Sequence, residues 1–293
     1  MRENISVSVI TAAYNAEKYI AESIDSVLKQ SQSNFEIIVV DDGSTDSTAQ
    51  IVDSFISKEP RITLIRQKNA GVSAARNAGF ANSSGKYIAY LDSDDVWKPN
   101  HLDLLLSRFE ADKNFGIVHG DCEEINEQSL KTDIHYHGHE GYLLNNILMG
   151  GKWINGPSGS LVSREAVKAV GGFDTDLSNG EDLDFFIRIA AMNYQIGRVS
   201  EETWFYRMHS NNAHLNIGSL ETDILKIYKK AEGMKLFKNT SFRNKCYSNV
   251  YFMLAGSFWS RGNNRIKTIK YLLKSIFTYP PMLIVFINKL THN

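Results

Sequence analysis

Short apolar runs alternate with helix-period segments through the first hundred residues. Each run is rich in β-branched residues and ends in a cluster of turn-forming polar residues, which is the pattern of a buried strand. Between the runs, apolar residues recur three or four positions apart, which predicts helices. The predicted strands are 5–12, 35–40, 61–65 and 88–91, and the predicted helices are 20–30, 46–56 and 71–82. Strands that alternate with helices in this way predict a doubly wound, mostly parallel α/β sheet flanked by helices.

The pattern is looser beyond residue 98. We expect a helix after Pro99, a strand at 115–119, and an irregular polar stretch at 121–150. A helix is expected at 181–192, followed by two separate strands at 194–199 and 203–207, and helical periodicity runs from about Ser219 onward. We therefore divide the chain into residues 1–98 and 99–214, as two halves of one domain, and a helical C-terminal extension at 215–293.

Composition places the chain among ordinary globular proteins. It is 43% hydrophobic and 22% charged, and its net charge of −1 gives no general basic field for nucleic acid. Two cysteines indicate a reducing compartment without a disulfide framework. Because Met1-Arg-Glu-Asn4 runs directly into a strand-like segment, we expect no signal peptide and a cytoplasmic location.

Three of the predicted strands end in polar residues, at 11–15, 41–46 and 92–95. Ligands of open α/β sheets bind beyond the carboxyl ends of the strands. Asp92, Asp94 and Asp95 would repel one another there unless a cation or hydrogen-bond donors balance them. A hard cation such as Mg²⁺ or Mn²⁺ would do so and could bridge to substrate phosphates. The alternative is an acidic turn that caps the next helix.

The glycine-rich motifs of common nucleotide sites are absent from the sequence. Neither Gly-x-x-x-x-Gly-Lys-Ser/Thr nor Gly-x-Gly-x-x-Gly occurs, which argues against a P-loop enzyme or a dinucleotide fold. Carboxylates with one arginine and a cation instead suggest a nucleoside diphosphate held through its base and the metal. Asp42 could accept a hydrogen bond from the base or cap a helix, and Arg76 could meet phosphate or form a surface salt bridge.

Four ordered segments resemble the family 2 glycosyltransferases, which are inverting enzymes of the GT-A fold. The resemblance spans about residues 5–212 and continues in later, shorter motifs. The segments are Val9–Asn15, Val39–Asp46, Ala70–Asn77 and Tyr90–Asp95, followed by Gly171–Asp174, Glu181-Asp182 and Tyr206–Asn211. The resemblance therefore implies a GT-A-type sheet with a donor-binding half at 1–98 and an acceptor-binding, catalytic half at 99–214.

The same resemblance assigns roles to matching positions. It implies a nucleotide-sugar site formed by Thr11, Ala13, Tyr14, Asn15, Asp42, Arg76, Asp92 and Ser93. Asp92-Ser93-Asp94 corresponds to the family's Asp-x-Asp motif, so Asp94 and Asp92 would bind Mn²⁺ or Mg²⁺, and His209 would complete the metal or diphosphate site. Asp182 is the position of the general base, and Glu181 precedes it.

An inverting transfer needs a carboxylate to take the acceptor's proton, because a hydroxyl is a poor nucleophile. Ser178-Asn-Gly-Glu181 resembles a capping box, which would put Asp182 in a first helical turn where the helix dipole favours its ionised form. The alternative is that Glu181 and Asp182 only complement that dipole.

Three histidines and the C-terminal segment need separate interpretations. His135, His137 and His139 could bind zinc if they lay on a strand, but no clear fourth ligand accompanies them, and we expect a solvated loop near the acceptor. The apolar run Ile276–Ile287, which Pro280 and Pro281 interrupt, is too short to span a bilayer, and basic residues precede it within the segment 265–290. They predict either peripheral contact with the inner face of the cell membrane or a helix packed on the domain or a partner subunit.

The sequence thus predicts a metal-dependent inverting glycosyltransferase that uses a nucleoside-diphosphate sugar, with UDP the expected carrier. The expected acceptor is a glycan or lipid-linked molecule of bacterial surface polysaccharide or lipopolysaccharide synthesis, and a homo-oligomer is compatible with the sequence. One alternative is a polymerising glycan synthase, against which the absence of Gln-x-x-Arg-Trp speaks. The other is a nucleotide-sugar-binding module without catalysis, against which the acids and His209 speak.

Overall fold

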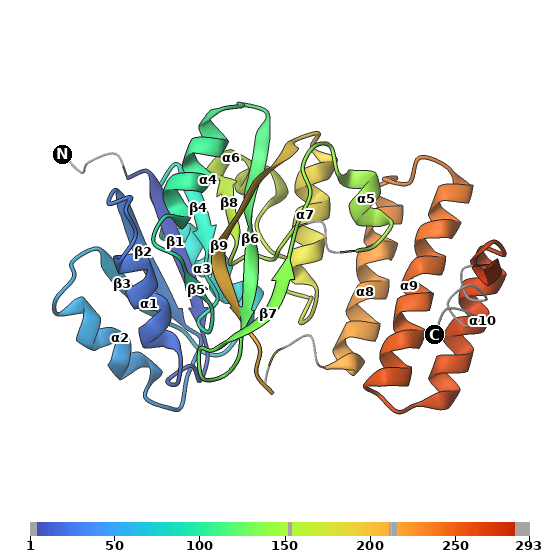
Figure 1. Ribbon diagram of the computed structural model, residues 1–293, viewed down its shortest axis with the longest axis horizontal. Helices are drawn as coiled ribbons and strands as arrows, with labels where there is room; N and C mark the ends of the chain where they lie inside the picture. The colour runs from blue at the N-terminus through green and yellow to red at the C-terminus, as the bar shows by residue number, and fades with distance from the viewer. Residues whose placement is uncertain (1–4, 152–153, 211, 213–215, 285–293) are drawn as a thin grey trace. The chain divides into compact units, whose positions relative to one another are not determined.

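The computed structural model describes residues 5–151, 154–210, 212 and 216–284 (Figure 1). The chain divides into two compact units. Met1–Leu143 and Lys152–His209 form the first, here called the sheet unit, and Leu144–Gly151 and Ser210–Asn293 form the second, called the helical unit.

The sheet unit begins with four parallel strands whose order reverses at the first one. Their bounds are β1 (Val7–Ala13), β2 (Phe35–Asp41), β3 (Ile62–Arg66) and β4 (Tyr87–Tyr90). β1 lies between β2 and β4, and β3 pairs with the outer side of β2. Because Ala13 lies beside Asp41 and Ile10 beside Tyr90, the chain leaves β1, β2 and β4 at one edge of the sheet. That edge is where an open α/β sheet binds its ligands.

An antiparallel strand continues the sheet into its second half. The further strands are β5 (Val96–Trp97), β6 (Phe115–Ile125), β7 (Lys131–Tyr136), β8 (Ser160–Ser163) and β9 (Gln195–Arg207). β8 lies antiparallel between β4 and β6, β9 runs parallel beside β6, and β5 and β7 pair antiparallel with β9 and β6. The strand order is β3-β2-β1-β4-β8-β6-β9-β5. β7 lies outside this order and pairs with Cys122–Ile125, the last residues of β6. The predicted α/β fold, with a mostly parallel sheet flanked by helices, is confirmed.

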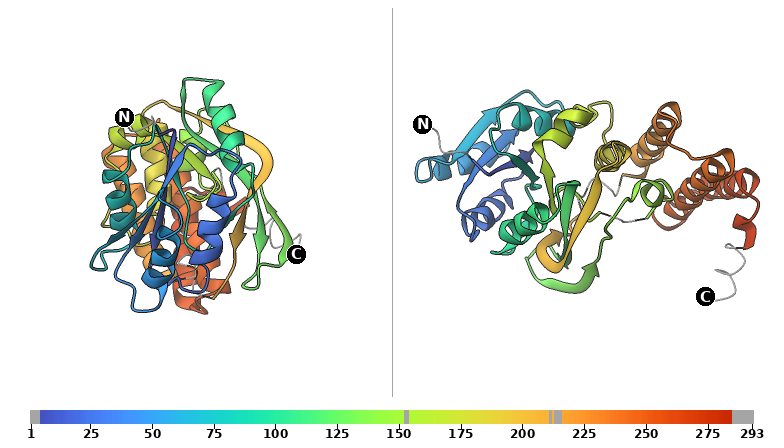
Figure 2. Two further views of the ribbon diagram at one scale, coloured as in Figure 1. Left: turned by 90° about the vertical axis from the view of Figure 1, so that its left-hand side faces the viewer. Right: turned by 90° about the horizontal axis from the view of Figure 1, so that it is seen from above.

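Helices cover both faces of this sheet (Figure 2). The helices of the sheet unit are α1 (Ile20–Leu28), α2 (Thr48–Ile56), α3 (Val72–Ala81), α4 (His101–Glu110), α6 (Arg164–Val170) and α7 (Glu181–Ala191). In β2, Ile37 and Val39 join the core cluster that holds α1, while Ile38 and Val40 pack with Ala75 of α3. This alternation follows from the two-residue period of a strand. α3 lies close to β1, since a Cβ on Gly79 would come 2.4 Å from Cγ2 of Ile10.

The predicted strand at 115–119 was too short, and the irregular stretch at 121–150 was wrong. β6 continues to Ile125 with every residue buried, and β7 and a short helix follow within that stretch. The polar pattern misled because the acids of β6 have partners inside the fold. Asp121 binds Arg198, and Glu124 accepts a hydrogen bond of 2.6 Å from the Tyr136 hydroxyl. The two strands predicted at 194–199 and 203–207 are one, β9, with a register shift opposite Gly120–Cys122.

The helical unit holds α5 (Leu144–Leu148), α8 (Ile217–Gly233), α9 (Thr240–Ser260) and α10 (Arg265–Thr278), so the predicted helical C-terminal region is confirmed. Asparagine side chains cap its three long helices. Asn216, Asn239 and Asn264 each accept a hydrogen bond from a backbone N–H in the first turn, which satisfies a donor that the helix leaves free. In the described residues, no helix has both the length and the hydropathy needed to cross a bilayer.

Asn77 of α3 fixes the loop that leads toward α7. Its amide donates to the carbonyl of Phe173 and accepts from the N–H of Phe173, both at 2.8 Å. Gly172 lies against this amide with φ of 78°, a conformation that favours glycine. The motif Ala70–Asn77 and the motif Gly171–Asp174 therefore contact each other directly in the fold.

Replacing Gly172 by alanine should destabilise the protein more than replacing Gly171. Gly171 has φ of 74°, and no described atom beyond its chain neighbours lies within 4 Å of a Cβ there, so alanine would cost only backbone strain, about 1–2 kcal/mol. At Gly172 the Cβ would lie 2.4 Å from Oδ1 of Asn77, which adds about 1–3 kcal/mol. Urea unfolding measures both changes, and equal destabilisation would contradict this account.

Candidate active site

The segments that follow β1 and β2 are bound to each other. Oγ of Ser44 accepts from the N–H of Asn15 at 3.0 Å, and Oδ1 of Asn15 accepts from the N–H of Thr45 at 2.8 Å. Thr11 and Ala13 are buried in β1, whereas Tyr14 is 53% exposed beside them. The predicted nucleotide-binding residues of the first motif thus stand at the open edge of the sheet, held by the loop after β2.

Asp42 accepts three hydrogen bonds that fix its carboxylate. The backbone N–H groups of Ala70 and Gly71 donate at 2.9 and 2.8 Å, and Nε2 of Gln67 donates at 2.7 Å. Asp42 is buried, and the segment it holds leads into α3. The carboxylate therefore holds the segment before a helix, as one alternative expected. Oδ2 accepts only one of the three hydrogen bonds, and a carboxylate oxygen can accept a second, as the base-binding alternative requires.

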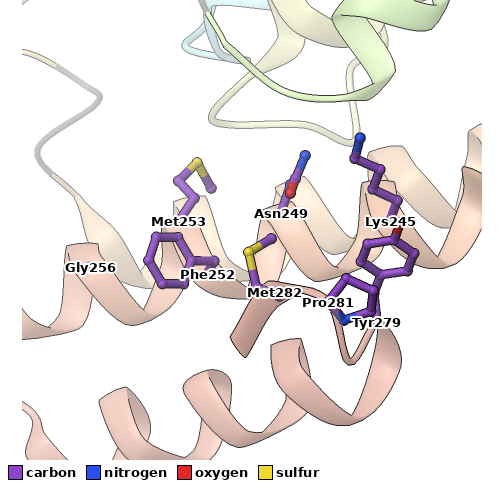
Figure 3. A pocket seen from close by; sticks show the side chains of 8 residues that line it. All are labelled: Lys245, Asn249, Phe252, Met253, Gly256, Tyr279, Pro281 and Met282. Atoms are coloured by element: carbon purple, nitrogen blue, oxygen red, sulfur yellow. The ribbon is translucent and has the colours of Figure 1, made fainter. Parts of the chain in front are cut away.

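A small cavity adjoins this segment. It has a volume of about 190 Å³ and is lined by Ala70–Ser73 at the start of α3 and by Thr175–Ser178 in the loop before α7. The larger cavity, about 610 Å³, belongs to the helical unit and lies along α9 and the turn after α10 (Figure 3). None of the predicted site residues lines either cavity, but Ala70 and Gly71 of the smaller one donate hydrogen bonds to Asp42.

The buried guanidinium of Arg76 joins two of the predicted acids. Nη2 lies 2.6 Å from Oδ1 of Asp92, and Nη1 lies 2.8 Å from Oε1 of Glu181. The Phe173 ring covers the guanidinium at 5.0 Å. The two carboxylates raise the pKa of Arg76 against the opposing effect of burial, so it stays charged. Residues 105 positions apart, on α3 and α7, are thereby brought into one site.

Asp94 binds His209 on the other side of the acid motif. Nε2 of His209 lies 2.7 Å from Oδ2 of Asp94, and the imidazole stacks on Tyr19 at 5.3 Å between ring centroids. The Asp94 side chain is 26% exposed and that of His209 is 11% exposed. The carboxylate is therefore reachable by a ligand, while the imidazole is held in place. Ser93, between the two acids, is half-buried.

The third acid of the motif, Asp95, is directed into the protein. Oδ1 accepts from the N–H of Arg207 at 2.9 Å, and the Ser158 hydroxyl also bonds to this carboxyl. Burial raises the pKa of Asp95 well above its usual range, and the nearby Asp94 and Asp92 add to the effect. Asp95 therefore has a structural role, whereas the side chains of Asp92 and Asp94 are partly exposed.

Asp182 lies in the first turn of α7, as predicted, but its environment differs from the expected one. The N-cap of α7 is Gly180, with φ of 74°, so the capping box expected at Ser178 is wrong. Burial, together with the adjacent Glu181, raises the pKa of Asp182 to about 6, although the N–H of Leu183 donates to it and Arg76 lies near. The helix dipole that was expected to favour the carboxylate is outweighed. A group of this pKa can still accept a proton at neutral pH.

The sequence did not identify several residues that position these acids. Phe173 lies on Arg76, Ser158 bonds to the N–H of Asp92 at 3.1 Å, and Arg207 is fully buried. Arg207 donates from Nε to the carbonyl of Asp94 at 2.7 Å and from Nη2 to Glu22 at 2.7 Å. Phe173 and Arg207 lie in motifs that were named from the sequence. A linear pattern, however, does not show which side chain of a motif points toward an acid. Asn211, the last residue of one motif, lies outside the described residues.

The three alternate histidines do not meet at one point. His135 lies on β7 and binds Glu202, while Nδ1 of His137 lies 2.8 Å from Asp121. The carbonyl of His139 bonds to the ring of His119 at 2.9 Å. Over the described ranges, no group of three or more His, Cys, Asp or Glu is arranged to hold a metal ion. The expectation of a loop was wrong for His135, which lies on β7, although its side chain is exposed to solvent.

Several bacterial proteins are similar in sequence to this chain. An uncharacterized glycosyltransferase of Nostoc sp. is 31% identical over 227 residues, which cover 75% of this chain and 70% of that protein. An uncharacterized glycosyltransferase of Rickettsia felis is 35% identical over 205 residues, 67% of this chain, and the chain spans only 32% of that relative's length. The minor teichoic acid biosynthesis protein GgaA of Bacillus subtilis is 34% identical over 207 residues, which cover 68% of this chain and 46% of GgaA.

Solved structures share the fold at lower sequence identity. The mannosyltransferase PcManGT of Pyrobaculum calidifontis, in complex with GDP-Man and Mn²⁺, has a TM-score of 0.65 at 17% identity and covers 97% of this chain and 79% of its own. TarS of S. aureus in complex with UDP-GlcNAc has a TM-score of 0.60 at 20% identity and covers 94% and 73%. The fold is accordingly of the GT-A type.

The model of glycosyl transferase family 2 matches residues 8–171, which is more than half of the chain. The matched range contains the Asp42, Arg76 and Asp92–Asp95 positions described above, and the resemblance seen in the sequence is confirmed. The chain belongs to glycosyl transferase family 2.

Proposed function

We propose that this protein transfers a sugar from a nucleoside-diphosphate sugar to an acceptor hydroxyl with inversion at the anomeric carbon. The observation that carries the proposal is the Arg76 bridge, with Asp92 on one side and Glu181 on the other. It links the acid motif at the sheet edge to the helix turn that holds Asp182. This link supports the proposal, because a direct displacement requires a donor-binding group and a base in one site.

The donor is assigned to residues 1–98. Asp42, held by three N–H donors, can accept from the N–H of a base, and Thr11, Ala13, Tyr14 and Asn15 form the adjacent edge. We take UDP as the carrier, supported by the complex of TarS with UDP-GlcNAc, while the complex of PcManGT with GDP-Man makes a guanosine donor the alternative. The acceptor is assigned to residues 99–214.

Asp182 is proposed as the general base. Its pKa of about 6 leaves it mainly ionised at neutral pH, and it is far more basic than an ordinary aspartate. Such a group can remove the acceptor's proton as the new glycosidic bond forms. Glu181 is bound to Arg76, which leaves Asp182 as the base of this pair, as a single displacement requires.

The residues at Asp94 fit a divalent cation. Oδ2 of Asp94 and Nε2 of His209 lie 2.7 Å apart. A carboxylate oxygen and an imidazole nitrogen are both ligands that Mn²⁺ accepts, so these two side chains would hold the ion if it were bound. Asp92 is the third candidate ligand, and phosphate oxygens would supply the rest. Mn²⁺ or Mg²⁺ bound there would neutralise charge on the departing diphosphate.

The acceptor class follows from chemistry and from relatives rather than from a defined pocket. GgaA is a teichoic acid biosynthesis protein, and a chondroitin synthase of Escherichia coli is 30% identical over 195 residues, 26% of its length. We therefore propose a glycan or lipid-linked acceptor in bacterial cell-surface polysaccharide synthesis. Single addition is favoured over polymerisation because the sequence lacks Gln-x-x-Arg-Trp.

Asp182→Asn should lower kcat by about 10²–10⁴-fold and leave the affinity for UDP within a few-fold, because the amide cannot accept the proton but keeps the side chain's size. Radiolabelled sugar transfer measures the first quantity and calorimetric UDP titration the second. Asp133→Asn, at an exposed position of β7, is the matched control. Transfer at the wild-type rate by Asp182→Asn would exclude this base.

The pH dependence of kcat/KM should fall on the acid side through about pH 6, where Asp182 becomes protonated in the free enzyme. Glu181→Gln removes a charge that raises this pKa, so the acid limb of the profile should move to lower pH. A limb that stays in place in Glu181→Gln would show that another group titrates.

UDP should raise the melting temperature more with Mn²⁺ than with EDTA. At a ligand concentration of 100 Kd the gain is about 2.7 kcal/mol, and the metal-dependent part should disappear in Asp94→Asn. Thermal denaturation with UDP, with Mn²⁺ and with both measures the coupling. Equal stabilisation by UDP with EDTA would contradict a metal-dependent donor site.

A further inference from the structure

α10 presents an apolar stripe on the side opposite its packed face. Ile266 and Phe277 are 82% and 80% exposed, and Ile269 and Leu273 between them are exposed as well. These positions recur every three or four residues along one side of the helix. Leu283 and Ile284 continue the exposed apolar surface past the end of α10. Contiguous apolar surface of this kind marks a binding face.

The packed side of α10 is fully used within the helical unit. Ser275 exchanges hydrogen bonds with Ser248 of α9 at 2.8 Å. Tyr271 stacks on Phe258 and donates from its hydroxyl to Glu221. The helix is therefore held by one face, and the apolar stripe is not a consequence of a loosely attached helix.

Lysines lie directly beside the stripe. Lys270 and Lys274 are exposed and cover the Tyr271 ring at 5.8 and 5.6 Å, and neither forms a salt bridge within the described part of the chain. Lys267, one turn earlier, is bound to Glu221 at 2.6 Å. The free ammonium groups thus border the apolar side chains along the length of the helix.

Residues 233–293 carry side-chain charges of one sign only. The last acidic residue of the sequence is Glu232, and residues 233–293 contain ten Lys and Arg. Residues 1–232 consequently carry a net charge of −11 and residues 233–293 a net charge of +10. The near-zero net charge of the chain conceals this asymmetry, which favours an anionic partner for the C-terminal helices.

We propose that the apolar stripe of α10 and its flanking lysines bind the surface of an anionic phospholipid bilayer. The helix would lie in the plane of the interface, with Ile266, Ile269, Leu273 and Phe277 among the upper acyl chains and the lysines at the phosphates. At about 1.5 Å per residue, α10 is about 21 Å long, too short to cross a bilayer. Residues 285–290 of the segment predicted to touch a membrane lie outside the described residues.

Charge decides between this occupant and a second copy of the chain. In a twofold contact the same surface meets itself, so the positive charge of Lys270 and Lys274 would be brought against a surface of the same sign. A bilayer rich in anionic lipid supplies the opposite charge over the full length of the stripe. The proposal does not rest on the transferase chemistry.

Co-flotation of the full chain with vesicles tests it. Vesicles of equal parts phosphatidylglycerol and phosphatidylcholine should carry the protein upward, and vesicles of phosphatidylcholine alone should carry little. The double variant Ile266→Ser, Phe277→Ser should bind the anionic vesicles about tenfold more weakly or worse. Lys270→Gln with Lys274→Gln should also bind at least tenfold more weakly, and added salt should weaken wild-type binding.

Matched controls separate these effects from a general loss of charge or apolar surface. Leu130→Ser removes an exposed apolar residue of the sheet unit, and Lys58→Gln with Lys113→Gln removes two exposed lysines there. Both controls should float like the wild type, and all variants should keep the wild-type circular dichroism spectrum. Sugar transfer to a water-soluble acceptor should be unchanged in the α10 variants, so failure of the two proposals can be told apart.

Three outcomes would overturn the proposal. The first is a wild-type chain that stays with neither kind of vesicle. The second is equal flotation of the wild type and both α10 variants. The third combines two observations: the wild type binds no vesicles, and it sediments as an oligomer that the Ile266→Ser, Phe277→Ser variant converts to a monomer. That result would make the stripe a protein interface.

Discussion

The Arg76 guanidinium holds the acids of the site in place. It is 3% exposed, and a charge so deeply buried is tolerated only where opposite charges and hydrogen bonds compensate its lost hydration. Asp92 and Glu181 supply that compensation from two segments that the chain separates by 89 residues, and the Phe173 ring closes the third side. Because each partner depends on the others, the guanidinium fixes the geometry between the edge of the sheet and the start of α7.

This arrangement also divides the acids by task. Asp92 and Glu181 are bound to Arg76, and Asp95 is buried on the N–H of Arg207. Asp94, bound to His209 and partly exposed, and Asp182, with a pKa of about 6, are left for a ligand and a proton. Neighbouring carboxylates acquire different properties because their surroundings differ, and the proposed function uses this difference for a cation and a base.

Polar residues in the second half of the sheet misled the reading of its strands. β6 buries Asp121, Glu123 and Glu124, which a linear pattern assigns to solvent. Each has a partner from another strand, as Asp121 has in Arg198 and Glu123 in Lys131. Pairing across strands cancels the cost of burial, and the partner of Asp121 lies 77 residues away in the chain. The strands in the first half of the sheet were predicted correctly, because their β-branched runs are apolar on both faces of the sheet.

The sequence by itself determined the alternation of strands and helices, the polar ends of β1, β2 and β4, and the family, because these depend on local composition and on the order of motifs. It also placed Asp182 in a first helical turn. Only the tertiary structure decided that Gly180 rather than Ser178 caps that helix, that Arg76 faces two acids, and that the pKa of Asp182 is raised. These properties depend on burial and on charges that lie close in space but far apart in the chain, and electrostatic energies follow distance in space.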